Sequence, residues 1–438
     1  MRQTKSIIPT FEFHDRTGIQ RFLETQAKKG WMLESLGKYI WKFRREEPKT
    51  LRFAVVYFPD ADLFDPAPGE AEETFRDFCA HGGWILAGAN AQMQIFHSEK
   101  EDPTPIETDP LLEVENIHRA MKKGSLPGYW LLIFSAVLQL VVQGMAIRSN
   151  VLQYLSHGFN LLMGATWSIL LFLLVYHLVH YYRWYRKAVI MAREQNKFLE
   201  TRSARLLTNF LTALLGLGFL TVIVTMENKS HALLLILSVA TVYGIMALTE
   251  LVRKKMQKDG WDSHTNRKTT LIATVVLVLI LYFVLAPAMA DVLDRNQQED
   301  REEDLAVTIW DLLGGNVEDY GVFYLTDQQS MLLQYQRIHQ YLDGGARTDV
   351  QYELVRAKAE FLYPFCLQKI MAVPAHIENA AFREIDPEKW GADKAWQLFE
   401  GEKARDWYVL CYGNTIMEII PTWAFTEEQI AVIAESMK

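Results

Sequence analysis

The sequence predicts an α+β multi-domain integral membrane protein. It combines a cytoplasmic ferredoxin-like β-α-β-β-α-β domain, a five-helix transmembrane region and an extracytoplasmic α+β domain. Three observations predict this organisation: five long uncharged runs, an uneven distribution of charge, and an approximate internal repeat near the N-terminus. The predicted segments are a cytoplasmic domain, a linker with an amphipathic helix, the transmembrane region and the extracytoplasmic domain, at residues 1–98, 99–123, 124–293 and 294–438.

The charge of the whole chain hides large differences between its segments. The 438 residues include 45 Lys+Arg and 53 Asp+Glu, which gives a net charge of −8, and 50% of the residues are hydrophobic. The net charge is −3 over residues 1–125, +8 over residues 126–293 and −13 over residues 294–438. This composition excludes collagen-like and fully disordered proteins, and three cysteines exclude a disulfide framework.

An internal repeat lies in the cytoplasmic segment. Residues 22–31 (FLETQAKKGW) recur approximately as residues 75–84 (FRDFCAHGGW). Each copy predicts an amphipathic helix that ends at glycine and leads through a tryptophan into an apolar strand. We expect Trp31 and Trp84 to anchor helix to sheet; the alternative is that the pair binds a ligand. Together with the other apolar segments, the expected order is β-α-β-β-α-β, with strands near 6–13, 33–45, 51–58 and 85–97.

The middle of the chain contains five uncharged runs of about 20 residues or more, each long enough to cross ~30 Å of hydrocarbon as a helix. Two alternate loops hold 13 basic residues, whereas the other two hold only Arg148 and Lys229. Because Lys and Arg mark cytoplasmic loops, we expect a multi-pass protein of the cell membrane with a cytoplasmic N-terminus, an extracytoplasmic C-terminus and the lipid bilayer as a partner. The expected spans are residues 126–147, 159–180, 206–226, 231–252 and 269–291.

Few polar side chains lie within these spans. Gln139 and Gln143 are one helical turn apart and predict interhelical hydrogen bonds. His177 and His180 lie at the cytoplasmic end of the second span. Such a pair could bind a haem or a metal ion, but we interpret it as part of an interfacial belt of aromatic and histidine side chains. We therefore expect no metal and no cofactor.

The C-terminal segment predicts an α+β domain. We expect a strand at residues 306–312, a Trp-rich helix at residues 387–400 and a hairpin formed by residues 407–412 and 415–420. Cys366 and Cys411 could form a disulfide outside the cell. The alternative is that both are buried free thiols.

Several features of the N-terminal segment resemble one bacterial family. They are the repeated helix-Gly-Trp units, Phe43 followed by Glu47-Pro48, and residues 105–110 (PIETDP) leading to residues 115–118 (ENIH). These features resemble the "domain of unknown function" family numbered 2812 (DUF2812), closely over residues 1–123 and more loosely over the membrane region. The resemblance implies a multi-span membrane protein of Gram-positive bacteria, often encoded beside PadR-type transcription regulators. It implies no catalytic residues.

Common catalytic motifs are absent from the sequence, including the P-loop, H-E-x-x-H, C-x-x-C and G-x-S-x-G patterns. A basic, aromatic-rich face for nucleic acid is also absent from the acidic N-terminal segment. We therefore expect a non-enzymatic membrane sensor or regulatory scaffold that couples an external domain to a cytoplasmic domain. The cytoplasmic domain is expected to bind a protein partner or to self-associate, with no role for nucleic acid. The alternative is a transport accessory or a small-molecule exporter.

Overall fold

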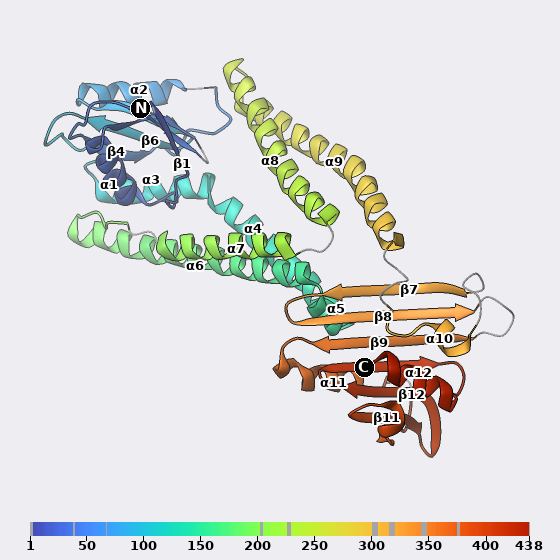
Figure 1. Cartoon of the computed structure of the whole chain (residues 1–438). Coiled ribbons are helices and arrows are strands. Elements are labelled where there is room, and N and C mark those ends of the chain that lie inside the picture. Colours follow the sequence, from blue (N-terminus) through green and yellow to red (C-terminus); the bar gives the residue numbers. More distant parts are fainter. Residues whose placement is uncertain are drawn as a thin grey trace. The chain divides into compact units, whose positions relative to one another are not determined.

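The computed structural model of the chain consists of two compact units (Figure 1). The N-terminal unit comprises Met1–Gln139 and Thr166–Met289, and the C-terminal unit comprises Leu140–Ala165 and Ala290–Lys438. The boundaries fall inside three helices, α4 (Leu126–Ser149), α6 (Gly158–Gln195) and α9 (Ser263–Glu299), so each helix is covalently continuous from one unit to the other. The structure describes residues 3–37, 40–66, 68–201, 205–225, 229–299, 305–314, 320–342, 348–374 and 377–437.

The N-terminal domain contains two consecutive βαββ repeats, each with its own three-stranded antiparallel sheet. The strand orders are β1-β3-β2 and β4-β6-β5. The first repeat is formed by β1 (Thr4–Ile7), α1 (Arg16–Lys28), β2 (Trp31–Leu36) and β3 (Trp41–Arg45). The second is formed by β4 (Arg52–Tyr57), α2 (Glu70–His81), β5 (Ile85–Asn90) and β6 (Met93–Ser98).

This arrangement confirms the internal repeat and corrects the predicted strand order. The ferredoxin-like β-α-β-β-α-β pattern is not observed, because residues 33–45 fold as the two strands β2 and β3, and residues 85–97 fold as the two strands β5 and β6. The chain reverses between Asn90 and Met93, which face each other across the hairpin. Ala91 adopts a φ of 49° at this turn, a conformation that non-glycine residues rarely take. A turn built on such a residue leaves little signal in the sequence.

The second sheet is covered on both faces (Figure 1). Alternate residues of β4 point to opposite sides, as strand geometry requires. Phe53, Val55 and Tyr57 pack in the main core with α1 and with α3 (Pro110–Lys123), whereas Ala54 and Val56 pack in a smaller cluster under α2. The two sheets meet at β2 and β5, where Leu36 lies against Gly88.

The N-terminal unit also contains α7 (Arg205–Thr225), α8 (Lys229–Lys258) and the part of α9 up to Met289. Within the described residues, α4 and α6 are the two helices long and apolar enough to cross a membrane, and α7 holds a shorter apolar segment, Leu207–Thr221. Large side chains of α4 such as Trp130, Leu131 and Phe134 are exposed, as expected for a lipid-facing helix. The structure thus supports membrane association with two candidate spans, and does not confirm a five-helix transmembrane region.

The C-terminal unit is built on a seven-stranded antiparallel sheet with the order β10-β11-β12-β13-β9-β8-β7. The strands are β7 (Tyr320–Gln329), β8 (Leu333–Leu342), β9 (Asp349–Ala357), β10 (Ala380–Glu384), β11 (Lys394–Glu400), β12 (Lys403–Tyr412) and β13 (Thr415–Pro421). The helices are α5 (Val151–Ser156), α10 (Ile309–Leu313), α11 (Tyr363–Ile370) and α12 (Glu427–Ser436), together with the short 3-10 turns η2 (Glu360–Leu362) and η3 (Glu388–Trp390).

The α+β character of this unit and its β12–β13 hairpin are confirmed, but two elements differ from the prediction. Residues 306–312 contain a helix start rather than a strand, because Thr308 and Asp311 form a capping box. Residues 387–400 form a 3-10 turn and a strand rather than a helix. A β-bulge in β11 between Gln397 and Phe399 explains the error, because it buries Ala395 and Leu398 three positions apart and so imitates helical spacing.

Candidate functional site

Four side chains capable of binding metal meet where the segment before α1 lies against the second half of α6, within the N-terminal unit. Glu12 and His14 come from the segment before α1, and His177 and His180 come from α6. Glu12 and His14 are buried, at 9% and 2% exposure. The structure therefore brings together residues that are about 165 positions apart in the sequence.

The start of α1 holds the segment in place. Asp15 is the N-cap of α1, and its carboxylate accepts a hydrogen bond from the Gly18 amide at 3.0 Å. The same carboxylate accepts from the Thr201 hydroxyl at 2.8 Å, and Thr201 Oγ1 accepts from the Thr17 amide at 3.1 Å. The helix cap thus also fixes residues 12–15 to the segment that follows α6.

The Glu12 carboxylate lies at the centre of the cluster. Its Oε1 is 2.8 Å from His177 Nδ1, and its Oε2 is 3.5 Å from His14 Nε2 and 3.8 Å from His180 Nδ1. Thr208 Oγ1 is 3.1 Å from His177 Nε2. If His177 Nδ1 donates to Glu12, its Nε2 is free to accept from Thr208, so a neutral His177 satisfies both contacts.

Burial and charge set the protonation states of Glu12 and His14. Burial acts to raise the pKa of Glu12, but the hydrogen bond from His177 and the neighbouring histidines outweigh it and hold this pKa below its usual value. Burial lowers the pKa of His14 to about 4, although Glu12 and Asp15 act in the opposite direction. At neutral pH the cluster therefore offers an ionised carboxylate and a neutral imidazole.

Aromatic rings enclose the histidines. The His14 ring lies 5.0 Å from the Tyr181 ring and 5.1 Å from the Trp184 ring, both on α6. Tyr176 stacks on His180 with 6.1 Å between ring centroids. This surround limits the access of water to the donor atoms, which strengthens electrostatic interactions within the cluster.

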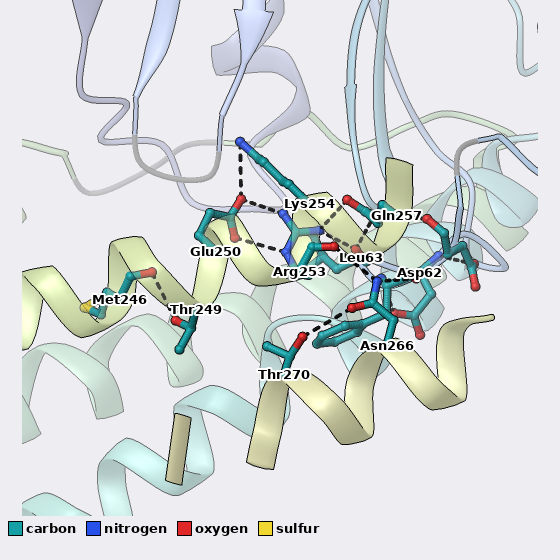
Figure 2. Close-up of polar contacts among 12 residues, drawn as sticks. Asp62, Leu63, Met246, Thr249, Glu250, Arg253, Lys254, Gln257, Asn266 and Thr270 are labelled. Carbon is teal, nitrogen blue, oxygen red and sulfur yellow. Dashed lines mark hydrogen bonds and ion pairs between the residues drawn. The ribbon is translucent and has the colours of Figure 1, made fainter. Parts of the chain in front are cut away.

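A second polar contact in the N-terminal unit joins the loop after β4 to α8 and α9 (Figure 2). Gln257 Nε2 donates to the Leu63 carbonyl at 2.6 Å and to the Asp65 carbonyl at 3.0 Å, and Arg253 also donates to the Leu63 carbonyl. Asn266 donates to the Phe64 carbonyl at 2.9 Å. These backbone carbonyls receive side-chain donors from both helices, so the loop is held at the turn between them.

Charged side chains complete this contact. Arg267 Nη2 is 2.5 Å from Asp62 Oδ2, and Lys123 Nζ donates to the Asp60 carbonyl at 2.9 Å. Glu250 pairs with Arg253 at 2.5 Å (Figure 2), which orients the guanidinium toward the loop. A cavity of about 220 Å³ lies beside the contact, between residues 61–65, residues 89–91 and α8.

The two tryptophans of the repeat lie where helix and sheet meet. Trp84 is buried in the cluster between α2 and the second sheet, and its Nε1 donates to the Thr104 carbonyl at 2.8 Å. Trp31 is half-buried against the main core, with Arg45 5.1 Å and Lys5 5.6 Å from its ring. The anchoring role of the two residues, and the alternative that they bind a ligand, stay predictions.

The other predicted residues are placed separately. Gln139 and Gln143 are half-buried on α4, and neither side chain forms a hydrogen bond with a residue whose placement is described. Cys366 and Cys411 lie in one core cluster of the C-terminal unit as free buried thiols, and burial raises the pKa of each. Their pairing in the cell stays a prediction.

His177 and His180 were identified from the sequence as interfacial residues, whereas Glu12 and His14 were missed. The available signal was the combination of Glu-x-His at residues 12–14 with His-x-x-His at residues 177–180. Alternate residues of an extended segment share one face, and residues three apart on a helix share one face. Nothing in the sequence indicates that these two faces meet.

Comparison with known proteins identifies one segment. Residues 16–126 match the model of the family described as "Protein of unknown function (DUF2812)", which confirms the resemblance over this part of the chain. No curated protein and no solved structure matches the chain.

Proposed function

We propose that this chain, whose residues 16–126 form a DUF2812 domain, is a membrane sensor or regulatory scaffold that couples an external domain to a cytoplasmic protein-interaction domain. The proposal rests on one observation, which is that α6 runs continuously from one unit into the other. Its first residues belong to the C-terminal unit and its last residues belong to the N-terminal unit. A change at one end of a continuous helix has a direct covalent path to the other end.

The segment that leads into α6 is bound to the sheet of the C-terminal unit. Asn150 caps α5, and its Nδ2 donates to the Tyr335 hydroxyl at 3.1 Å. Ser330 Oγ donates to the Leu155 carbonyl at 2.7 Å. Leu152 is buried in the core cluster that also contains Tyr335. These contacts are the means by which a movement of the sheet would reach α6.

The end of α6 is bound to the core of the N-terminal unit. Tyr181, Trp184 and Ala188 are buried in the main core with α1 and α3. Trp184 Nε1 donates to the Leu199 carbonyl at 3.2 Å, and the ring of Tyr185 stacks on His118 of α3 at 4.0 Å. Packing of this density transmits a displacement rather than absorbing it. The contact between residues 60–65 and the turn of α8 and α9 adds a second connection in the same unit.

The proposal includes five spans, with α7, α8 and α9 joining α4 and α6. Its support is the uncharged runs of the sequence and the basic residues between α6 and α7 and between α8 and α9. A reporter active only in the cytoplasm, fused at the C-terminus, should be inactive, whereas one fused at the N-terminus should be active. The opposite pattern would contradict this orientation.

The outer face of α2 is the proposed surface for a protein partner or a second copy of the chain. Phe78 of α2 is 66% exposed, and Leu86 of β5, which lies opposite Phe96 on the α2 side of the second sheet, is 36% exposed. Neighbouring apolar side chains left in water favour association. The remainder of the domain directs its large apolar side chains mainly into the core.

Coupling can be tested by weakening the α5 contact and measuring the N-terminal domain. We expect Leu152→Ala to increase hydrogen–deuterium exchange in residues 8–15, measured by mass spectrometry on the intact protein in lipid nanodiscs. The physical reason is that α6 loses an anchor at its start, and the segment fixed to its end is loosened. Peptides from α12 should remain unchanged and so exclude global unfolding.

The matched control is Arg405→Gln, which removes an exposed ion pair with Glu400 from the same unit without touching α5. It should leave exchange in residues 8–15 unchanged. Equal exchange in the wild type and Leu152→Ala would show that the α5 contact is not coupled to the N-terminal domain, and the proposal would fail.

A further inference from the structure

The Glu12 cluster, which consists of Glu12, His14, His177 and His180, has the donor atoms of a metal-binding site. Metal binding is not part of the coupling proposal and is not required by it. We infer that Glu12, His14 and His180 bind one divalent transition-metal ion, for which Zn²⁺ is the best fit. The three residues offer donor atoms that all lie within 4.8 Å of one another. Metal binding at this position would stand even if the two units were not coupled.

The spacing of the donor atoms suits a zinc ion. Zinc–nitrogen and zinc–oxygen bonds are about 2.0–2.1 Å long, which puts two ligands of a tetrahedral ion about 3.4 Å apart. Glu12 Oε2 is 3.5 Å from His14 Nε2 and 3.8 Å from His180 Nδ1. The 3.8 Å separation exceeds the tetrahedral value, so binding requires a small movement of the partly exposed His180 side chain toward Glu12.

One of the three proposed donor atoms is buried and makes no hydrogen bond with a described residue. His180 Nδ1 is inaccessible to solvent and has no hydrogen-bond partner among the residues described. A buried polar nitrogen without a partner costs free energy, which coordination of a metal ion would recover. His14 is almost fully buried beside it and presents Nε2 toward the same carboxylate oxygen.

An outer layer of contacts fixes the carboxylate. His177 holds Glu12 Oε1 at 2.8 Å and is itself held by Thr208, which leaves Oε2 directed at His14 and His180. Outer contacts of this kind orient metal ligands in known sites. The ionised Glu12 and neutral His14 described above are the protonation states that coordination requires.

The donor set decides the class of ion. Two imidazoles and one carboxylate favour zinc or another first-row transition metal over Ca²⁺ and Mg²⁺, which prefer oxygen ligands. Three protein ligands leave a fourth position of a tetrahedral ion open to water. Because the ligands come from both the segment before α1 and α6, a bound ion would cross-link these two elements.

The test uses the purified full-length protein in detergent, stripped of metal with a chelator and titrated with ZnCl₂ in a calorimeter. We expect one equivalent of zinc to bind. Glu12→Gln, His14→Gln and His180→Gln should each weaken binding by more than about 100-fold, and His177→Gln by about 10–100-fold because it removes an outer contact only. The matched control is His97→Gln, a half-buried histidine of β6 outside the cluster, which should bind as the wild type does.

X-ray absorption at the zinc edge provides a second measurement that needs no variant. The loaded wild type should show a shell of nitrogen and oxygen ligands at about 2.0 Å that includes imidazole and no sulfur. Failure to bind one equivalent would overturn the inference, as would a sulfur-containing shell. Stoichiometric binding that persists in folded Glu12→Gln and His14→Gln variants would also overturn it. Variants that fail to fold leave the absorption measurement to decide.

Discussion

The two βαββ repeats share one pattern but differ in what covers them. In the first repeat, α1 buries Ile19, Leu23 and Ala27 in the main core, which continues into α3 and α6. In the second, α2 forms the outer layer of the domain and buries Cys79 alone among its residues (Figure 1). Phe78 of α2 is left 66% exposed.

This difference in covering shows how two copies of one motif can form different contacts. The first repeat begins with residues 12–17, which contact α6 and the segment after it through Glu12, Asp15 and Thr17. The second repeat contributes its sheet to the same core, and its helix packs on the opposite face of that sheet through Phe75 and Cys79. We interpret the first repeat as the part that joins the membrane helix and the second as the part that faces a partner.

The largest expected effect on the free energy of unfolding distinguishes a buried residue of α1 from an exposed residue of α2. Leu23→Ala should lower the free energy of unfolding by about 2–5 kcal/mol, because it removes a fully buried side chain and leaves a cavity. Phe78→Ala should change it by no more than about 0.5 kcal/mol. Scanning fluorimetry of the intact protein in detergent measures both, and equal shifts in the two variants would contradict the proposed difference.

The contrast between the repeats was only partly predictable. The Phe-to-Trp spacing of residues 22–31 and 75–84 revealed both helices, and the glycines marked their ends. The hairpin of β5 and β6 was missed because its turn depends on Ala91 rather than on a glycine. Which helix would be covered could not be predicted, because both have amphipathic sequences and the covering element lies far along the chain.

The Glu12 cluster was unpredictable for the same reason. Each half of it has an ordinary interpretation in isolation: Glu12 and His14 lie at and just beyond the end of the strand predicted near residues 6–13, and His177 and His180 lie at the end of an apolar helix. Only the tertiary contact brings these four side chains together into one cluster. In β11, by contrast, a local feature caused the error, since the bulge changes the period of buried residues within the strand.

An effect of intermediate size is expected on the pH dependence of stability, through the ion pair that joins α1 to α3. Arg16 at the start of α1 pairs with the buried Glu113 of α3. Burial raises the pKa of Glu113 to about 7 from its ordinary value of 4.5, although Arg16 acts in the opposite direction. The folded protein therefore holds a proton there that the unfolded chain has released, so this group makes stability fall as the pH rises from about 4.5 to 7.

Glu113→Gln should remove that dependence. The loss of stability between pH 5 and pH 8 should be smaller in the variant than in the wild type, by on the order of 1–3 kcal/mol. Glu70→Gln on the exposed start of α2 is the control and should not alter the pH dependence. Parallel pH curves for Glu113→Gln and the wild type would rule out this effect of burial.

The smallest effect on stability is expected at the partner surface. Phe78→Glu should reduce self-association or partner binding while leaving the unfolding midpoint close to that of the wild type, because the side chain is exposed. Light scattering after size-exclusion chromatography reports the mass of the complex. An oligomeric wild type whose mass is unaffected by Phe78→Glu would place its interface elsewhere.

The most direct test of the central claim, that the first repeat and not the second is joined to α6, is amide exchange of α1 and α2 in one sample. In the intact wild type, α1 should exchange at least about tenfold more slowly than α2. Combining Trp184→Ala with Thr201→Val removes a ring beside His14 and the hydroxyl bound to Asp15. This variant should accelerate exchange in α1 and leave α2 unchanged. Equal exchange of the two helices in the wild type, or an α1 that does not respond to the variant, would contradict the claim.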